Sequence, residues 1–512
     1  MNVSTFLKHW NIKENPFLAE EARQDQVFAR LAGPSGELRP GGRGLESQHP
    51  DFEKILGDPS RPATAIVFGE KGAGKTAIRL QIEDAIRSHN GKHPDAKTLV
   101  VPYDDLNPIL DRFVRSQATS DPTKALESLR LVDHIDGILS VAVPKLVDSV
   151  LKNEAGSIDL GERPETVLRR LKPADKKRWS GLQLLYDRPD QLPERGKSLR
   201  RALRLFAPNW GRPLRWIGGA LWALLIGLIV LYRLADEADR SWLHVLAMVA
   251  VGGMATVLSG RLLVDWWKNW KRARRLSDQL RVVDRTVHGW RNALGRMPWG
   301  LLQGVSLPLD ELDDARYERL DDLCRILAPF GYTSIVVLID RVDEPSLISG
   351  DAARMRSVIW PLFNNKFLQH DRIALKMMLP IELRHELHRQ SKEFFQEARM
   401  DKQNLIDRLD WSGTTLYDLC STRLRACAEP GTELSLIDLF DDTVNRQDVV
   451  DALDQMRQPR DAFKLMYQLV QQHCATATDE EENWQIPKLV LDQVRREQVE
   501  RLEALHRGFG PA

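Results

Sequence analysis

The sequence predicts an α/β fold: a three-layer sandwich with a parallel central sheet, interrupted by a two-helix hairpin and followed by a C-terminal helical domain. Three observations predict it. A glycine-rich loop stands between a strand and a helix near residue 70, a second aliphatic strand ends in acid at residue 340, and two uncharged apolar stretches lie between them. With 512 residues, 43% of them apolar, the chain is long enough for more than one packed domain.

The glycine-rich loop, GEKGAGKT, matches the phosphate-binding pattern G-x-x-x-x-G-K-[ST]. It follows the β-favouring run 64–68, and residues 77–86 after it carry apolar side chains at helical spacing. Glycines let backbone N–H groups turn toward phosphates, Lys75 reaches the β- and γ-phosphates, and the Thr76 hydroxyl can bind Mg²⁺. The alternative is an ordinary glycine-rich turn. We expect ATP and Mg²⁺ at Gly69, Glu70, Lys71, Gly72, Ala73, Gly74, Lys75 and Thr76.

The run SIVVLID, residues 334–340, is the only long aliphatic run that ends in an acid. Asp340 is therefore the predicted second Mg²⁺ residue. Glu344, with Asp343 as second choice, is the predicted catalytic residue that orients and activates the attacking water. The alternative is a buried strand with a solvated charge at its end. The runs 98–101 and 373–379 can complete the parallel sheet.

The stretch between the two motifs is much longer than a compact core needs, so an insertion is predicted. Residues 216–232 and 242–260 carry no charge, and each would form a helix of roughly 26–29 Å, just enough for a hydrocarbon core of ~30 Å. We expect a transmembrane hairpin with membrane lipid around it. Two buried helices in a large soluble core are the alternative.

The flanks of the two apolar stretches are basic. Residues 195–215 hold seven Lys/Arg and no acid, and residues 261–285 hold eight Lys/Arg against three acids. The segments beside the apolar stretches are therefore strongly basic, although the net charge of the chain is only +1. Basic flanks of this kind, with tryptophans at the edges and no cleavable signal peptide, predict a multi-pass membrane protein with both termini cytoplasmic. Reading these flanks as a nucleic-acid patch is the less favoured interpretation.

The remaining segments carry weaker signals. Cys324, Cys420, Cys427 and Cys474 have no metal-ligand spacing, so neither a zinc site nor a disulfide framework is predicted. Pro459 begins a helix, and the adjacent Arg460 is a candidate nucleotide-binding residue that would sense the γ-phosphate, although most such arginines are surface charges. The expected divisions are an N-terminal segment with a Gly/Pro-rich loop (1–50), the first half of the nucleotide-binding core (51–194), the hairpin with its basic flanks (195–285), the second half of the core (286–400), and a helical lid with a tail (401–512).

Together these residues resemble the KAP family of P-loop NTPases, in which paired transmembrane segments interrupt the NTPase domain between two motifs, here Gly69 to Thr76 and Ile335 to Asp340. The run Asp340 to Glu344, DRVDE, departs from the adjacent double acid common in that family. It is more similar to the endings of other STAND-class signalling ATPases, and segments 409–411 and 459–461 are similar to helical lids of STAND and AAA+ proteins.

The resemblance implies an ATP-dependent switch or scaffold on the bacterial inner membrane, of the sort found in antiviral defence or stress signalling. We expect its hydrolysis of ATP to be slow. It also implies partners: further copies of the chain in a homo-oligomer, or separate defence subunits. Two alternatives stay open: a nucleic-acid-acting AAA+ ATPase of the transposition or replication loader type, and an interaction protein that binds ATP without hydrolysing it.

Overall fold

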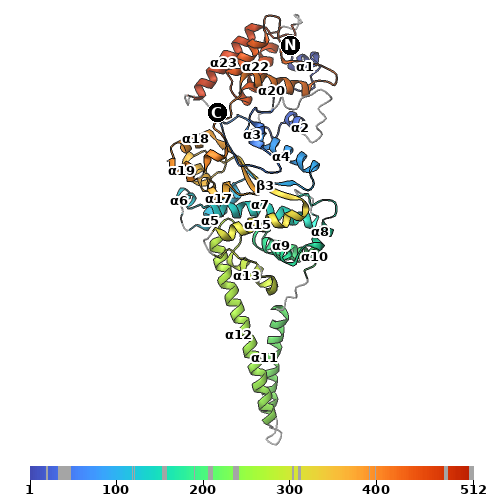
Figure 1. The fold of residues 1–512 in the computed structure, drawn as a ribbon, viewed down its shortest axis with the longest axis vertical. Helices are drawn as coiled ribbons and strands as arrows, with labels where there is room; N and C mark the ends of the chain where they lie inside the picture. The colour runs from blue at the N-terminus through green and yellow to red at the C-terminus, as the bar shows by residue number, and fades with distance from the viewer. Residues whose placement is uncertain are drawn as a thin grey trace. The chain divides into compact units, whose positions relative to one another are not determined.

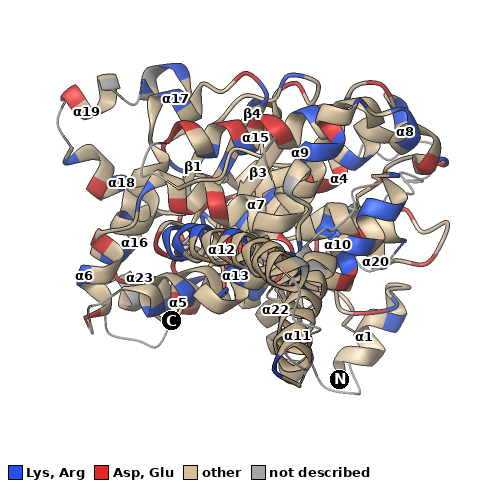
Figure 2. Cartoon of the chain, turned by 90° about the horizontal axis from the view of Figure 1, so that it is seen from below, with Lys and Arg blue, Asp and Glu red and all other residues tan. Residues whose placement is uncertain are grey.

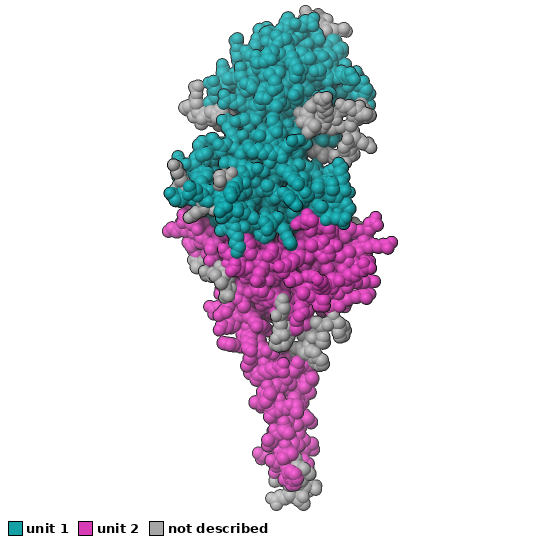
Figure 3. All heavy atoms as spheres, viewed as in Figure 1, with its two compact units in different colours: residues 1–105, 334–512 teal, residues 106–333 magenta. Residues whose placement is uncertain are grey.

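The computed structural model describes residues 1–18, 21–32, 48–117, 119, 121–152, 158–189, 191–205, 211–234, 242–302, 305–309, 313–390, 392–397, 399–477 and 483–506. The Gly/Pro-rich loop expected at 33–44 lies outside these residues. The chain divides into two compact units, residues 1–105 with 334–512, and residues 106–333 (Figure 3). The hairpin segment and the helices that flank it in sequence belong to the second unit.

The first unit is built around a five-stranded parallel sheet, which confirms the mixed α/β class. The strand order is β2-β3-β4-β1-β5, so one strand separates the first strand of the chain from the strand that precedes Asp340. The predicted strands all form, and a short fifth strand joins them beside the first. The strands are β1 Ala65–Gly69, β2 Lys97–Tyr103, β3 Tyr332–Ile339, β4 Ile373–Pro380 and β5 Asn404–Ile406.

The centre of this sheet is buried on both faces, as parallel strands require. Every residue of β1 and β4 is buried, and Ile78, Ile82 and Ile86 of helix α4 join Val67 and Val336 in one apolar cluster. The helices of the sheet region are α3 Phe52–Leu56, α4 Lys75–Lys92, α16 Ala352–Ile359, α17 Asn365–Leu368, α18 Ile381–His388 and α19 Lys392–Glu397 (Figure 1).

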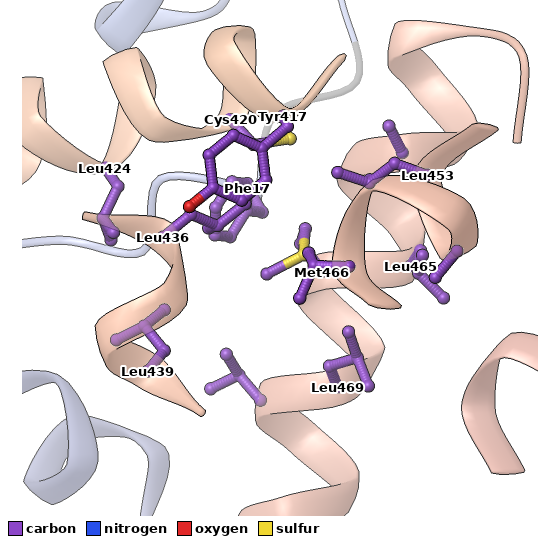
Figure 4. Packing of buried hydrophobic residues seen from close by; sticks show 14 of the residues in the cluster. Phe17, Tyr417, Cys420, Leu424, Leu436, Leu439, Leu453, Leu465, Met466 and Leu469 are labelled. Atoms are coloured by element: carbon purple, nitrogen blue, oxygen red, sulfur yellow. The ribbon is translucent and has the colours of Figure 1, made fainter. Parts of the chain in front are cut away.

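A second apolar cluster in the same unit joins the two ends of the chain. Phe6 and Phe17 pack with residues of the C-terminal helices, among them Leu416 and Met466 (Figure 4). Gly413 allows two of these helices to approach closely, because a Cβ there would lie 2.3 Å from the carbonyl oxygen of Val450. The helices of this cluster are α1 Val3–His9, α2 Gln26–Ala32, α20 Gly413–Cys427, α21 Arg446–Asp454, α22 Pro459–Thr476 and α23 Lys488–His506.

The second unit is helical. Two of its arginines pair with buried aspartates: Arg195 with Asp148 at 2.7 Å and Asp187 at 3.0 Å, and Arg281 with Asp133 at 2.5 Å. Its helices are α5 Asn107–Ser116, α6 Pro122–Glu127, α7 Leu131–Leu151, α8 Pro164–Arg170, α9 Pro173–Tyr186, α10 Leu192–Ala202, α11 Gly211–Leu234, α12 Trp242–Gln279, α13 Val287–Arg296, α14 Trp299–Leu302 and α15 Asp314–Leu327.

Helices α11 and α12 run side by side as an antiparallel hairpin (Figure 1). The Trp222 indole donates a hydrogen bond to the Ser259 hydroxyl at 3.0 Å, and Gly218 lies against Leu258. Both helices are long and apolar enough to cross a membrane, and only 6% of an apolar 18-residue stretch of each helix is buried. Helix α12 continues to Gln279, past the predicted end near residue 260, because the basic stretch that follows contains no helix breaker.

Candidate nucleotide-binding site

The loop between β1 and α4 curls back on itself through two glycines. Gly72 and Gly74 have φ values of 101° and 92°, which a side chain would strain. Gly72 is constrained a second time, because a Cβ would lie 2.9 Å from Oε1 of Gln458 and 3.0 Å from Cβ of Arg460. Gly74 caps the amino terminus of α4, where unpaired N–H groups and the helix dipole favour an anion.

Lys75 begins α4 and is folded back over the loop. Its Nζ donates hydrogen bonds to the carbonyl oxygens of Gly69 and Glu70, at 2.7 and 2.9 Å. Burial lowers the pKa of Lys75, and surrounding carboxylates oppose this shift. In decreasing order of effect, they belong to Asp343, Asp340, Glu382 and Glu70. Lys75 is thus a cation surrounded by four carboxylates, next to a helix terminus that favours phosphate.

Thr76 and Asp340 meet although 264 residues separate them in sequence. The Thr76 hydroxyl donates a hydrogen bond of 2.9 Å to Oδ2 of Asp340, which directly follows β3 and is 1% exposed. Burial raises the pKa of Asp340, while the Thr76 hydrogen bond and the Arg79 charge lower it. A hydroxyl and a carboxylate in contact are two of the hard oxygen ligands that Mg²⁺ takes.

A protein-only metal cage is absent from the described part of the chain, which holds no group of three or more metal-ligating side chains. Thr76 and Asp340 would therefore hold Mg²⁺ together with phosphate oxygens and water, which is how Mg²⁺ is usually bound beside nucleotides. The four cysteines are all buried.

Arg79, one turn after Thr76, is a site residue that sequence reasoning missed. Its Nε lies 3.7 Å from Oδ2 of Asp340, and its Nη1 lies 2.6 Å from Glu83 and 3.4 Å from Asp104 at the end of β2. Only 4% of it is exposed. The sequence does contain a signal for Arg79. It lies between Ile78 and Ile82, on the side of the predicted helix that should be buried, where an arginine needs a partner. Arg79 provides positive charge behind the predicted metal residue.

The two candidate catalytic acids lie in a tight turn after Asp340. Arg341 adopts φ 58°, and its guanidinium pairs with the Glu344 carboxylate at 3.2 Å. Partial burial raises the pKa of Glu344, and Arg341 opposes the shift. The Glu344 side chain is 53% exposed, whereas Asp343 is half-buried. Of the surrounding carboxylates, Asp343 has the largest effect on the pKa of Lys75. Asp343 is therefore the acid tied more directly to Lys75.

The start of α22 lies against the loop. The Arg460 backbone N–H points to the carbonyl oxygen of Gly72 at 3.5 Å, and Gln458 donates a hydrogen bond to the Glu70 carboxylate. Arg408, after β5, pairs with the same carboxylate at 2.7 Å. Arg460 is thus beside the phosphate-binding loop.

A cavity of about 370 Å³ borders Arg460. Its lining combines aromatic and cationic side chains, which suit a planar or anionic group. The lining residues are Phe17, Leu18, Arg460, Phe463, Lys464, Tyr467, Gln468 and Arg501.

Trp411 and His49 support the loop from another side. The Trp411 indole donates a hydrogen bond to the Ala73 carbonyl at 2.9 Å, and the His49 ring packs edge-on against Trp411. His49 is 3% exposed; its Nδ1 accepts from the Asp51 N–H at 3.1 Å, so its Nε2 carries the proton shared with the Asp410 carbonyl at 2.9 Å. These contacts describe a neutral imidazole.

We expect the stability contributed by His49 to be lost in acid. Burial lowers its pKa below the ordinary value of 6.5, so the unfolded chain binds more protons, and this contribution is present above pH 6.5 and falls as pH falls through that value. Urea unfolding at pH 7.5 and 5.5 measures the effect. In His49→Gln, which cannot titrate, the difference between the two pH values should be smaller than in the wild type. An unchanged difference would contradict the burial argument.

Comparison with protein-family models, with curated proteins and with solved structures finds no match to this chain. The assignment of function therefore stands on the residues and their geometry.

Proposed function

We propose that this protein is a membrane-anchored P-loop ATPase that acts as an ATP-dependent switch or scaffold. The observation that carries the proposal is the contact of 2.9 Å between Thr76 and Asp340, formed where the strand–loop–helix of the glycine-rich motif meets the end of β3. The strand order, with β4 between β1 and β3, is compatible with the AAA+ and STAND resemblance of the sequence.

The chemistry follows from the side chains already gathered at the loop. Backbone N–H groups at the start of α4 bind the phosphates, and Lys75 leaves the carbonyl oxygens of Gly69 and Glu70 to pair with the β- and γ-phosphates. Thr76 and Asp340 would hold Mg²⁺, whose charge would offset the negative charge that develops on the phosphate oxygens. Glu344, or Asp343, orients the attacking water, and Arg460 adds positive charge from α22.

The coupling between nucleotide and the rest of the unit runs through Glu70 and Gly72. Both residues belong to the phosphate-binding loop, and both contact the start of α22 through Gln458 and Arg460. A loop that rearranges around phosphate would change these contacts, so α22 and the helices packed with it act as the lid that reports nucleotide state. Signalling or defence is the output class we favour, as the resemblance implies.

The anchor is the hairpin of α11 and α12. Large apolar side chains that a soluble core would bury are exposed on both helices, such as Trp216 at 82% and Val257 at 74%. Because the helices are antiparallel, their basic flanks emerge at the same end, which supports a multi-pass protein of the bacterial inner membrane with both termini cytoplasmic. This exposure argues against the alternative of two buried core helices.

We expect Glu344→Gln to lower kcat for ATP hydrolysis by roughly 100-fold with little change in ATP affinity, since a positioned general base contributes typically 10²–10⁴-fold. Steady-state phosphate release and binding of a fluorescent ATP analogue measure the two quantities. Asp343→Asn is the matched comparison, because Asp343 acts most strongly on Lys75: a larger kcat loss there would move the catalytic role to Asp343.

The rival functions predict other results. If the protein binds ATP only to support an interaction and never hydrolyses it, Lys75→Ala would abolish that interaction and Glu344→Gln would leave it unchanged. A nucleic-acid-acting ATPase would bind DNA in a salt-dependent manner and hydrolyse ATP faster in its presence.

A further inference from the structure

The end of α12 carries a dense group of cations and tryptophans. Residues 266–275, WWKNWKRARR, contain five Lys/Arg and three Trp without an acid. The basic residues of this segment are blue in Figure 2. It belongs to the same continuous helix as the apolar stretch 242–260, so the position of its side chains follows from helix geometry.

One face of α12 changes along its length from apolar to cationic. At about 100° per residue, Lys268, Lys271 and Arg275 fall within roughly 60° of arc, and this arc also contains Val257 and Val264. Val257 is 74% exposed and Val264 is 49% exposed, and the three cations are exposed as well. The surface that would face lipid therefore continues into a stripe of positive charge, and the exposed Arg274, about 60° to one side of this arc, widens the stripe.

The charge of this stripe is not neutralised within the part of the chain that the structure describes. No carboxylate lies within ion-pair distance of Lys268, Lys271, Arg274 or Arg275 there, in contrast to Arg195 and Arg281 of the same unit. Two of these cations instead lie over indole rings, Lys271 at 5.4 Å from Trp267 and Arg274 at 5.8 Å from Trp270. Indoles and cations side by side are typical of a membrane interface.

The depth of the cations matches the headgroup layer. At 1.5 Å per residue, Lys268 lies about 6 Å and Lys271 about 10 Å beyond Val264 along the helix. The polar layer of one leaflet is roughly 5–8 Å thick, and charges act over a Debye length of about 8 Å at physiological salt. With Val264 at the edge of the hydrocarbon, Lys268 lies in the headgroup layer and Lys271 lies just beyond it. Arg274 and Arg275, about 15–17 Å beyond Val264, lie within about a Debye length of the outer edge of that layer.

We propose that Lys268, Lys271, Arg274 and Arg275 of α12 form a binding surface for anionic phospholipid headgroups of the cytoplasmic leaflet. The inference rests on the proposed membrane anchor. A headgroup layer fits these cations better than nucleic acid does, because the stripe begins where the exposed apolar face ends. Clusters of four or more cations directly beside a transmembrane helix attract anionic lipid electrostatically.

The test compares the lipids that surround the full-length protein. The chain is reconstituted into vesicles of phosphatidylcholine with a minor fraction of phosphatidylglycerol, excised with its lipid shell by a detergent-free polymer, and the shell is analysed by mass spectrometry. We expect phosphatidylglycerol to be enriched at least two-fold over the bulk membrane. Enrichment should vanish in the variant Lys268→Gln, Lys271→Gln, Arg274→Gln, Arg275→Gln.

A matched control removes the same charge elsewhere in the second unit. Lys124→Gln, Arg169→Gln, Arg170→Gln and Lys172→Gln change four exposed cations outside α12 and should leave the enrichment intact. Insertion without enrichment, or equal loss in both variants, would overturn the lipid proposal and leave the ATPase untouched. DNA binding in phosphatidylcholine vesicles that only the α12 substitutions remove would overturn it in favour of nucleic acid. A chain that never inserts would overturn the proposed anchor as well.

Discussion

Lys75→Ala is expected to reduce kcat/KM for ATP hydrolysis by at least about 100-fold, the loss typical of removing one preorganised positive group from a charge-stabilising site. Lys75 is the central cation of the phosphate-binding loop. It starts α4, contacts two loop carbonyl oxygens, and stands in the field of four carboxylates that would repel ATP without it. Phosphate release under saturating and limiting ATP measures the loss, and binding of an ATP analogue locates it.

Lys71→Ala is the matched control for this experiment. Lys71 lies in the same loop, four residues earlier, and is exposed. Removing its side chain should change kcat/KM only slightly, because position 71 contributes its backbone N–H group to the predicted loop, and an exposed cation is screened by water and salt. Near-wild-type hydrolysis by a folded Lys75→Ala protein would contradict the assignment of ATP hydrolysis to this loop. An equal loss in both variants would show that the general charge of the loop matters instead of the specific contact of Lys75.

Local patterns predicted much of this region. The strand at 64–68, the glycine-rich loop and the helix after it each have a signature within about ten residues, and the structure has all three in place. Asp340 was found for the same reason, as the acid that ends a continuous aliphatic run. Such features are set by near neighbours in the chain, so periodicity and composition reveal them.

Contacts between distant segments could not be predicted in this way. The Glu70 carboxylate meets Arg408 and Gln458, which are 338 and 388 residues away. Strand β5 has three residues, too few for a period-two pattern, and His49 is recognised as structural only once its ring is seen against Trp411. These features depend on how the C-terminal helices pack near the loop, and a single sequence carries no signal for that packing.

Placing an arginine in the middle of each hairpin helix should remove the protein from the membrane. Leu224 and Val249 are near the centres of the two apolar stretches and are 53% and 70% exposed. An arginine at the centre of a membrane-spanning helix costs about 2.5–3.5 kcal/mol on insertion scales, so the double variant Leu224→Arg, Val249→Arg should lower the inserted fraction by several orders of magnitude. Membrane fractionation after an alkaline wash measures it.

The same double variant separates the two interpretations of the hairpin, because both positions face outward. In a soluble protein, arginine at two exposed positions changes stability by only about 0.5 kcal/mol each, and the fractionation pattern would stay as it was. Leu489→Arg in α23 is the control: Leu489 is 78% exposed and lies outside the hairpin, so the variant should fractionate like the wild type. A wild-type chain found wholly in the soluble fraction would contradict the anchor hypothesis. Release of the double variant alone would establish that the exposed apolar surface of α11 and α12 holds the protein at the membrane.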